Sequence, residues 1–210
     1  MSGLFVVVEG PEGAGKTSLA RWLAARLLAE GRPLVAVREP GGTPVAEAAR
    51  KIALKSRHEL APETELFLIL AARSDLVTRV IRPALEAGDI VLADRFGLST
   101  LCYQVAGRGL PRDEVAAALH LATGGLTPDL TLVLDVPVEV GRERQQRARK
   151  VRDRFESADD AFHERVRRAY AEAQGPGVVH IDATRTKATV QEAAWRELAA
   201  VAAPSTRGMA

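Results

Sequence analysis

The sequence predicts an α/β protein built on a parallel sheet with helices on both faces. Five short, nearly continuous apolar runs have the length and composition of buried strands, and they cover residues 4–8, 34–37, 90–93, 130–134 and 178–181. Longer segments with helical periodicity separate these runs, and strands that alternate with helices pair in parallel. No internal repeat or long linker divides the 210 residues, so we expect one domain over residues 1–203. Residues 204–210 are expected to form a disordered tail.

Proline and glycine residues mark the expected helices. Pro44 and Pro62 can each occupy the first position of a helix, and Gly88 follows the end of the second one. The expected helices cover residues 18–30, about 44–55, 62–87, 98–105, 112–122, most of 138–174, and 187–201.

The composition excludes several functional classes. A net charge of +2 gives no general nucleic-acid surface, so we expect no nucleic-acid partner. The single cysteine, Cys102, excludes an internal disulfide and a cysteine metal cluster, and it is compatible with a reducing compartment. The first apolar run is too short to cross a membrane, and no signal peptide or membrane segment is recognisable. We therefore expect a cytoplasmic protein without a membrane partner.

The strongest motif follows the first predicted strand. Residues 10–17 match G-x-x-x-x-G-K-[ST] between a strand and a helix, the context in which this pattern binds a nucleoside triphosphate. The glycines let backbone N–H groups face phosphate oxygens, and the helix N-terminus adds its positive dipole. Lys16 would contact the β- and γ-phosphates, and Thr17 would hold Mg²⁺. The predicted nucleotide-binding residues of this loop are Gly10, Pro11, Glu12, Gly13, Ala14, Gly15, Lys16, Thr17 and Ser18. The alternative is a glycine-rich turn without a ligand.

Charged residues follow the second and third predicted strands, where Arg38, Asp94 and Arg95 lie. Parallel sheets bind ligands outside the carboxyl ends of their strands, so these side chains should meet beside the phosphate loop. Asp94 is a candidate for steadying Mg²⁺ or its waters together with Thr17. The alternative for Asp94 is a surface residue at the start of the next helix.

The arginines favour phosphoryl transfer to a second phosphate, because two polyanions repel each other and several cations must offset that repulsion. Arg38, Arg73 and Arg95 are candidates for an acceptor-phosphate pocket, where no general base is needed because a phosphate oxygen is already ionised. A second group lies in an arginine-rich lid over about residues 142–157 and contains Arg144, Arg147, Arg149, Lys150, Arg152 and Arg154. Their mutual repulsion predicts a mobile lid that closes over bound anions and expels water. The alternative is a solvated helix face.

Several motifs in a fixed order make the chain similar to the thymidylate kinases, P-loop enzymes that transfer the γ-phosphate of ATP to dTMP. The similarity extends from Phe5 to about Ala183. The motifs are the phosphate loop, Arg38-Glu39-Pro40-Gly41-Gly42-Thr43, Ala71-Ala72-Arg73, Val80-Ile81-Arg82-Pro83-Ala84-Leu85, Asp94-Arg95, Leu98-Ser99-Thr100 with Tyr103-Gln104, and Arg147-Ala148-Arg149 with Asp153-Arg154. The Arg-Glu-Pro-Gly-Gly-Thr run is highly specific to that family.

The resemblance implies ATP and dTMP as substrates, Mg²⁺ as cofactor, dTDP and ADP as products on the way to dTTP, a five-stranded parallel sheet and a homodimer. The implied catalytic residues are Lys16, Glu12, Arg95, Arg147 and Arg149, with Glu12 near the 3′-hydroxyl of the acceptor sugar. Outside the phosphate loop, the implied ATP contacts are Arg144, Asp182 and Ala183, the last two beside the adenine.

The resemblance also implies an acceptor site. Arg38 and Arg95 would grip the acceptor phosphate, and Arg73 would meet the thymine edge. The remaining implied acceptor contacts are Glu12, Ile69, Ser99, Thr100, Tyr103 and Gln104; Tyr103 would crowd out a ribose 2′-hydroxyl. The phosphate loop of this chain contains no arginine. In members of the family with such a loop, the lid supplies the catalytic arginines, so the resemblance implies this role for the lid.

The chain departs from the family pattern at three places. Ile69 replaces a phenylalanine that stacks on thymine, Phe96 stands where tyrosine or histidine is common, and the lid holds one extra residue between Arg144 and Arg147. Phe67 lies about 120° from Arg73 on the helix, so it is a poor substitute for the missing ring and is expected to pack into the core.

Three alternatives remain open at this stage. They are a P-loop kinase for another nucleotide or nucleoside, a nucleotide-dependent switch or binding module, and a catalytically weak ATP-binding relative. A guanine-specific switch is disfavoured because the sequence contains no asparagine and therefore no Asn-Lys-x-Asp motif.

Overall fold

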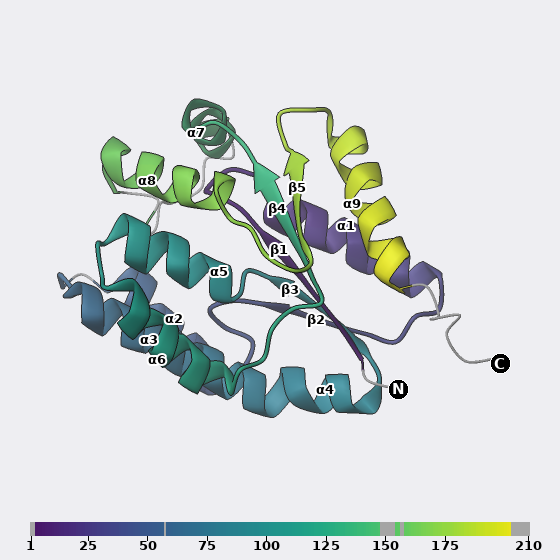
Figure 1. Cartoon of the computed structure of the whole chain (residues 1–210), viewed down its shortest axis with the longest axis horizontal. Helices are drawn as coiled ribbons and strands as arrows, with labels where there is room; N and C mark the ends of the chain where they lie inside the picture. Colours follow the sequence, from purple (N-terminus) through teal and green to yellow (C-terminus); the bar gives the residue numbers. More distant parts are fainter. Residues whose placement is uncertain (1–2, 57, 148–153, 156–157, 203–210) are drawn as a thin grey trace.

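The computed structural model describes residues 3–56, 58–147, 154–155 and 158–202. Within them, five strands form one parallel sheet: β1 (Leu4–Glu9), β2 (Leu34–Arg38), β3 (Ile90–Asp94), β4 (Leu130–Asp135) and β5 (Val178–Asp182). The strand order is β2-β3-β1-β4-β5, so β1 is central (Figure 1). The predicted α/β class is confirmed, and each predicted strand lies inside an observed strand.

All five strands run to a charged residue at their carboxyl ends, beyond the apolar run that predicts each of them. These terminal residues are Glu9, Arg38, Asp94, Asp135 and Asp182. In a parallel sheet these ends lie along one edge, so the topology places a row of charges there. That edge holds the candidate site.

The helices alternate with the strands as predicted. They are α1 (Lys16–Ala29), α2 (Pro44–Lys55), α3 (Pro62–Leu76), α4 (Arg82–Ala87), α5 (Gly97–Thr100), α6 (Arg112–Thr123), α7 (Val138–Arg147), α8 (Asp160–Ala171) and α9 (Lys187–Ala202), with π-helical segments η1 (Val77–Ile81) and η2 (Leu101–Gly107). Helices α1 and α9 cover one face of the sheet, while α2 to α6 and α8 lie on the other (Figure 1).

The two faces of β1 explain how the core divides. Val6 and Val8 pack against Leu23 of α1 and other buried residues of α1 and α9. Phe5 and Val7 point the opposite way and pack against the α3–η1–α4 run. Successive side chains of a strand alternate between faces, so one apolar strand supports both helical layers.

The predicted helix over residues 62–87 is continuous but changes its hydrogen-bonding pattern at η1. Pro83 follows η1 and has no N–H group, so the regular i→i−4 ladder is interrupted there. The helix predicted over residues 98–105 starts at Gly97 and continues as η2 to Gly107. Such π-helical turns often occur at functional sites, and η2 contains Tyr103 and Gln104.

The expectation that Phe67 packs into the core is wrong, because its side chain is 63% exposed. Helix α3 belongs to an outer layer and buries only one face, which carries Leu66, Ile69, Leu70 and Arg73. Phe67 lies outside that face, as its angular distance from Arg73 requires.

Parts of two predictions lie outside the described residues: the tail over residues 204–210, and the part of the lid that contains Arg149, Lys150 and Arg152. No helix in the described part of the chain is long and apolar enough to span a membrane.

Candidate active site

The phosphate loop connects the central strand β1 to the N-terminus of α1 in a tight turn. Gly13 adopts a φ of +73°, and a Cβ atom there would lie 2.1 Å from the carbonyl oxygen of Gly141. Gly10, with a φ of +141°, faces the backbone of Leu134 with similarly little room. These two positions therefore require glycine, and the loop stays narrow enough to face a phosphate chain.

Lys16 is folded back into the loop. Its ammonium donates a hydrogen bond to the carbonyl oxygen of Pro11 at 2.6 Å, and the side chain is only 7% exposed. Burial and the nearby positive charge of Arg95 outweigh the carboxylates around it and lower the pKa of Lys16 to about 8. A bound polyphosphate would place negatively charged oxygens next to this ammonium.

The two residues predicted to hold Mg²⁺ meet directly. The hydroxyl of Thr17, at the start of α1, donates to Oδ2 of Asp94, at the end of β3, at 2.5 Å. Mg²⁺ prefers oxygen ligands and is commonly held by one or two protein oxygens together with substrate phosphates. This pair beside the phosphate loop fits such an ion, although the described residues hold no group of three or more His, Cys, Asp or Glu side chains that could bind a metal ion by themselves.

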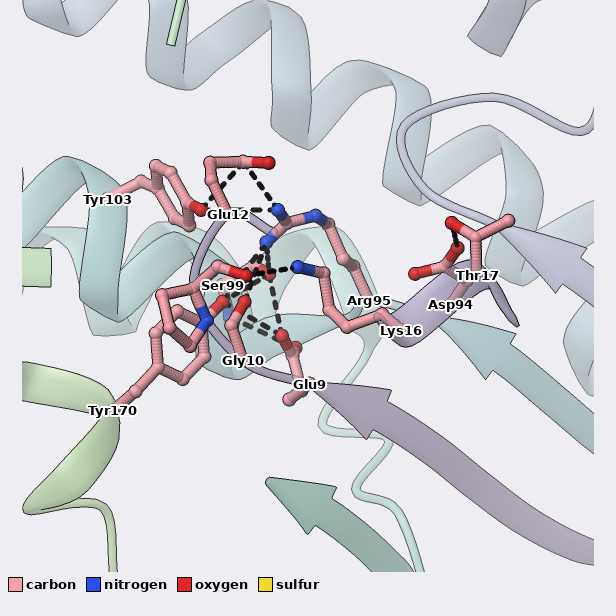
Figure 2. Close-up of polar contacts among 11 residues, drawn as sticks. Glu9, Gly10, Glu12, Lys16, Thr17, Asp94, Arg95, Ser99, Tyr103 and Tyr170 are labelled. Atoms are coloured by element: carbon pink, nitrogen blue, oxygen red, sulfur yellow. Dashed lines mark hydrogen bonds and ion pairs between the residues drawn. The ribbon is translucent and has the colours of Figure 1, made fainter. Parts of the chain in front are cut away.

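Arg95 is the centre of a partly buried polar network (Figure 2). It follows β3 with a φ of +77°, a left-handed conformation that is uncommon outside glycine and that turns its side chain toward the phosphate loop. Its Nη2 donates to Oε1 of Glu12 at 2.6 Å and to the hydroxyl of Tyr103 at 3.1 Å. Its Nη1 donates to Oγ of Ser99 at 3.1 Å and to the hydroxyl of Tyr170 at 3.2 Å.

Glu12 is ionised in this network. Burial opposes the charge of its carboxylate, but Arg95, Lys16 and a hydrogen bond from Tyr103 together lower its pKa to about 2. The hydroxyl of Tyr103 donates to Oε1 of Glu12 at 2.8 Å. The predicted acceptor residues Glu12, Arg95 and Tyr103 therefore form one contact group.

Sequence reasoning missed Glu9 and Tyr170, which lie behind Arg95. The fully buried carboxylate of Glu9 accepts hydrogen bonds from the backbone N–H groups of Phe96 and Ser99 and from the hydroxyls of Ser99 and Tyr170. Tyr170 comes from α8 and is itself fully buried. A charged residue closing an apolar strand was the available signal for Glu9, whereas nothing in the sequence distinguishes Tyr170 from an ordinary core residue.

Arg73 is held by three partners and is 2% exposed. Its guanidinium donates to Oε2 of Glu39 at 2.6 Å, to Oγ1 of Thr100 at 2.6 Å, and to the carbonyl oxygen of Phe96 at 3.0 Å. Burial raises the pKa of Glu39 to about 7 despite the adjacent guanidinium. Arg38 differs from Arg73 because it lies half-exposed at the rim and pairs with Glu47 at 3.1 Å.

A cavity of about 500 Å³ joins the phosphate loop to these arginines. The predicted site residues that line it are Glu12, Gly13, Gly15, Lys16, Thr17, Ser18, Arg38, Ile69, Arg73, Asp94, Arg95, Ser99, Thr100, Tyr103 and Gln104. Its apolar wall consists of Leu54, Ile69 and Phe155, and the ring of Phe155 meets Tyr103 edge-on with centroids 5.3 Å apart. Phe155 was not anticipated; an aromatic residue directly after Arg154, inside the arginine-rich lid segment, was the available signal.

The predicted ATP contacts beyond the loop meet at a separate position. Nη2 of Arg144 donates to the carbonyl oxygen of Ala183 at 2.8 Å, and Asp182 closes β5 immediately before it. Arg147 instead lies exposed on α7, where it pairs with Glu143 at 2.6 Å, and it does not line the cavity. Arg149 lies outside the described residues.

The chain is similar to known proteins over most of its length. The family model described as thymidylate kinase matches residues 8–194. A thymidylate kinase of Pseudomonas putida (strain GB-1) is 52% identical over 171 residues, which is 81% of each chain. A thymidylate kinase of Pseudomonas entomophila (strain L48) is 48% identical over 197 residues, covering 92% of this chain and 93% of the relative. The family predicted from the motifs is confirmed: the chain belongs to the thymidylate kinase family.

Proposed function

We propose that the protein transfers the γ-phosphoryl group of ATP to dTMP, giving dTDP and ADP on the route to dTTP. The single observation that carries this proposal is the cavity in which the phosphate loop faces the predicted arginines Arg38, Arg73 and Arg95. Membership of the thymidylate kinase family supports the enzyme class and the acceptor. Bringing two anionic substrates into one cavity requires fixed cations, and Lys16, Arg38 and Arg95 supply them.

At the donor end, Lys16 exchanges its hydrogen bond to Pro11 for the β- and γ-phosphate oxygens. Thr17 and Asp94 would hold Mg²⁺, which would offset part of the negative charge of the phosphates. Arg144 and Ala183, already in contact, would lie beside the adenine. The lid arginines Arg147 and Arg149 are proposed to reach the transferring group when the lid closes.

At the acceptor end, Arg95 presents a guanidinium that the protein already holds in place, so little freedom is lost when the dTMP phosphate binds. Arg38, at the rim, would grip the same phosphate. The attacking phosphate oxygen is ionised at neutral pH, so the reaction needs charge compensation and alignment rather than a general base. Glu12, bound to Arg95 and Tyr103, would accept a hydrogen bond from the sugar 3′-hydroxyl.

The thymine ring would lie between the apolar wall and the polar groups of the cavity. Ile69 and Phe155 would cover its face, while Arg73, Ser99, Thr100 and Gln104 would surround its edge. Tyr103 would occupy the space of a ribose 2′-hydroxyl. Phe155 adds an aromatic surface on the side where Ile69 replaces the usual phenylalanine, so it would offset part of the stacking on thymine that this replacement removes.

We also propose one kinase domain over residues 1–203, a homodimer and a cytoplasmic location. Four large apolar side chains are exposed on the neighbouring helices α2, α3 and α6: Val45, Ile52, Phe67 and Leu121. Exposed apolar surface on adjacent helices favours contact with a second copy. The buried thiol of Cys102 suits a reducing compartment.

Coupled measurement of ADP release with dTMP, dUMP, dGMP and thymidine as acceptors tests the proposal. We expect dTMP to be the best substrate and thymidine to give no turnover, because it lacks the phosphate that Arg95 would grip. Turnover with thymidine would favour a nucleoside kinase. ATP binding without turnover on any acceptor would favour a catalytically weak relative.

A further inference from the structure

The amide of Gln104 is held in one orientation by residues that do not line the cavity. Its Nε2 donates to Oε1 of Glu65 at 3.2 Å. Both side chains are 1% exposed, and Gln104 lines the cavity whereas Glu65 does not. A carboxylate only accepts hydrogen bonds, so the NH₂ group of Gln104 must face Glu65.

Glu65 is itself fixed by Arg108. Nε and Nη2 of Arg108 donate to the two carboxylate oxygens of Glu65 at 3.0 and 2.8 Å, a two-point ion pair that prevents rotation of the carboxylate. Arg108 also lies over the ring of Phe162, with 4.7 Å between its Cζ and the ring centroid. Glu65 stands in the first turn of α3, where the helix dipole favours a negative charge.

The carbonyl oxygen of Gln104 is consequently available to a ligand. No group in the described part of the chain donates to this Oε1 atom in the hydrogen bonds that the structure contains. Arg73, on the same cavity, only donates; three of its five N–H groups are engaged by Glu39, Thr100 and Phe96. The cavity therefore offers a fixed acceptor and a fixed donor to the edge of a base.

This pair matches the edge of thymine and opposes that of cytosine. Thymine presents an acceptor at O4 beside a donor at N3–H, whereas cytosine presents a donor at its 4-amino group beside an acceptor at N3. We propose that Glu65, fixed by Arg108, is a positioning residue that sets the selectivity for a base with an N3–H group by fixing the amide of Gln104. The proposal rests on the proposed function, since it assumes that a pyrimidine monophosphate is the acceptor.

The test compares kcat/KM for dTMP, dUMP and dCMP in the wild type, in Glu65→Gln and in Glu63→Gln. Glu65→Gln keeps the shape of the side chain but gives Gln104 a partner that both donates and accepts, so the amide can turn over. Glu63→Gln makes the same charge change at an exposed position of the same helix turn. Sites built to pair a polar group reject the mismatched analogue strongly, so we expect the wild type to prefer dTMP over dCMP by at least about 10³.

In Glu65→Gln, the ratio of kcat/KM for dTMP to kcat/KM for dCMP should fall by about tenfold or more, and kcat/KM for dCMP should rise in absolute terms. The ratio of dTMP to dUMP should stay the same, because these two bases share one hydrogen-bonding edge. Glu63→Gln should behave like the wild type. A general distortion of the pocket would lower all three acceptors without any gain for dCMP, and that result would overturn the proposal.

An unchanged dTMP to dCMP ratio in a folded Glu65→Gln protein would also overturn it. Glu65→Gln leaves Arg108 without its anion, so the double variant Glu65→Gln/Arg108→Gln, which buries no unpaired charge, is measured as well. It too should lower the ratio of kcat/KM for dTMP to that for dCMP, and an unchanged ratio would overturn the proposal. A wild type that does not phosphorylate dTMP would instead refute the proposed function, so the two failures are distinguishable.

Discussion

The hydroxyl of Tyr170 allows a direct test of how Arg95 is positioned, because Tyr170→Phe removes one oxygen and keeps the ring. That hydroxyl donates to Oε2 of Glu9 at 2.9 Å and accepts from Nη1 of Arg95 at 3.2 Å in a fully buried setting. Glu9 keeps its other donors, from Phe96 and Ser99, and Nη1 of Arg95 keeps Ser99. The change therefore loosens the network without emptying it.

The magnitude follows from what is lost and what remains. A hydrogen bond to a charged group contributes about 1.5–3 kcal/mol, and the remaining partners offset part of this loss, so we expect the unfolding free energy to fall by about 1–2 kcal/mol. A loosened Arg95 should bind dTMP less well by about 1 kcal/mol, which is about fivefold in Kd. Thymidine lacks the phosphate, so its affinity should not change.

Urea denaturation gives the first quantity, and calorimetric titration with dTMP and thymidine gives the second. The same titrations in an Arg95→Ala background provide the control, since Tyr170→Phe should add no further loss of dTMP affinity there. If Tyr170→Phe weakened dTMP and thymidine equally, Tyr170 would act on the whole pocket rather than on Arg95. Unchanged dTMP affinity in Tyr170→Phe would refute the reasoning outright.

Three further predictions concern the same cavity. Because the pKa of Lys16 in the free protein is lowered to about 8, its ammonium is present below that pH and lost above it. The affinity for ATP should therefore be constant below pH 8 and fall above it, where ATP binding should be coupled to proton uptake. Calorimetry that finds no pH dependence of ATP binding up to pH 9.5 would contradict this prediction. Arg95→Ala should mainly raise KM for dTMP and Arg149→Ala should mainly lower kcat, because the lid charge acts in the transition state; equal effects of both changes on both parameters would mean that these roles are misassigned. Ile69→Phe should lower KM for dTMP by about fivefold through added stacking while KM for ATP stays the same, and a folded variant with no gain for dTMP would argue against thymine packing at this wall.

The sequence predicted the parts of this protein that local patterns encode. Each apolar run became a strand, and the spacing of Gly10 to Thr17 anticipated the phosphate loop. The contact between Thr17 and Asp94 followed from two motifs and the rule that parallel strands end at one edge.

Contacts that depend on tertiary packing were not predictable in this way. Glu65 and Tyr170 resemble ordinary helix residues in the sequence, and only the packing of α3, η2 and α8 brings them to Gln104 and Arg95. Phe67 was misplaced for a related reason: an aromatic residue on a helix usually faces the core, but α3 leaves this side uncovered in a single chain.

The most direct measurement of the central claim follows the transferred phosphate itself. The wild type is incubated with dTMP and ATP that is labelled at the γ-phosphate, and the products are separated by chromatography. We predict that the label moves to dTDP and that it does so only when dTMP is present. A Lys16→Ala variant, checked by its thermal melt to be folded, should transfer almost no label because the charge facing the phosphates is gone. Label that stays in ATP, or appears only as inorganic phosphate in the folded wild type, would contradict the account.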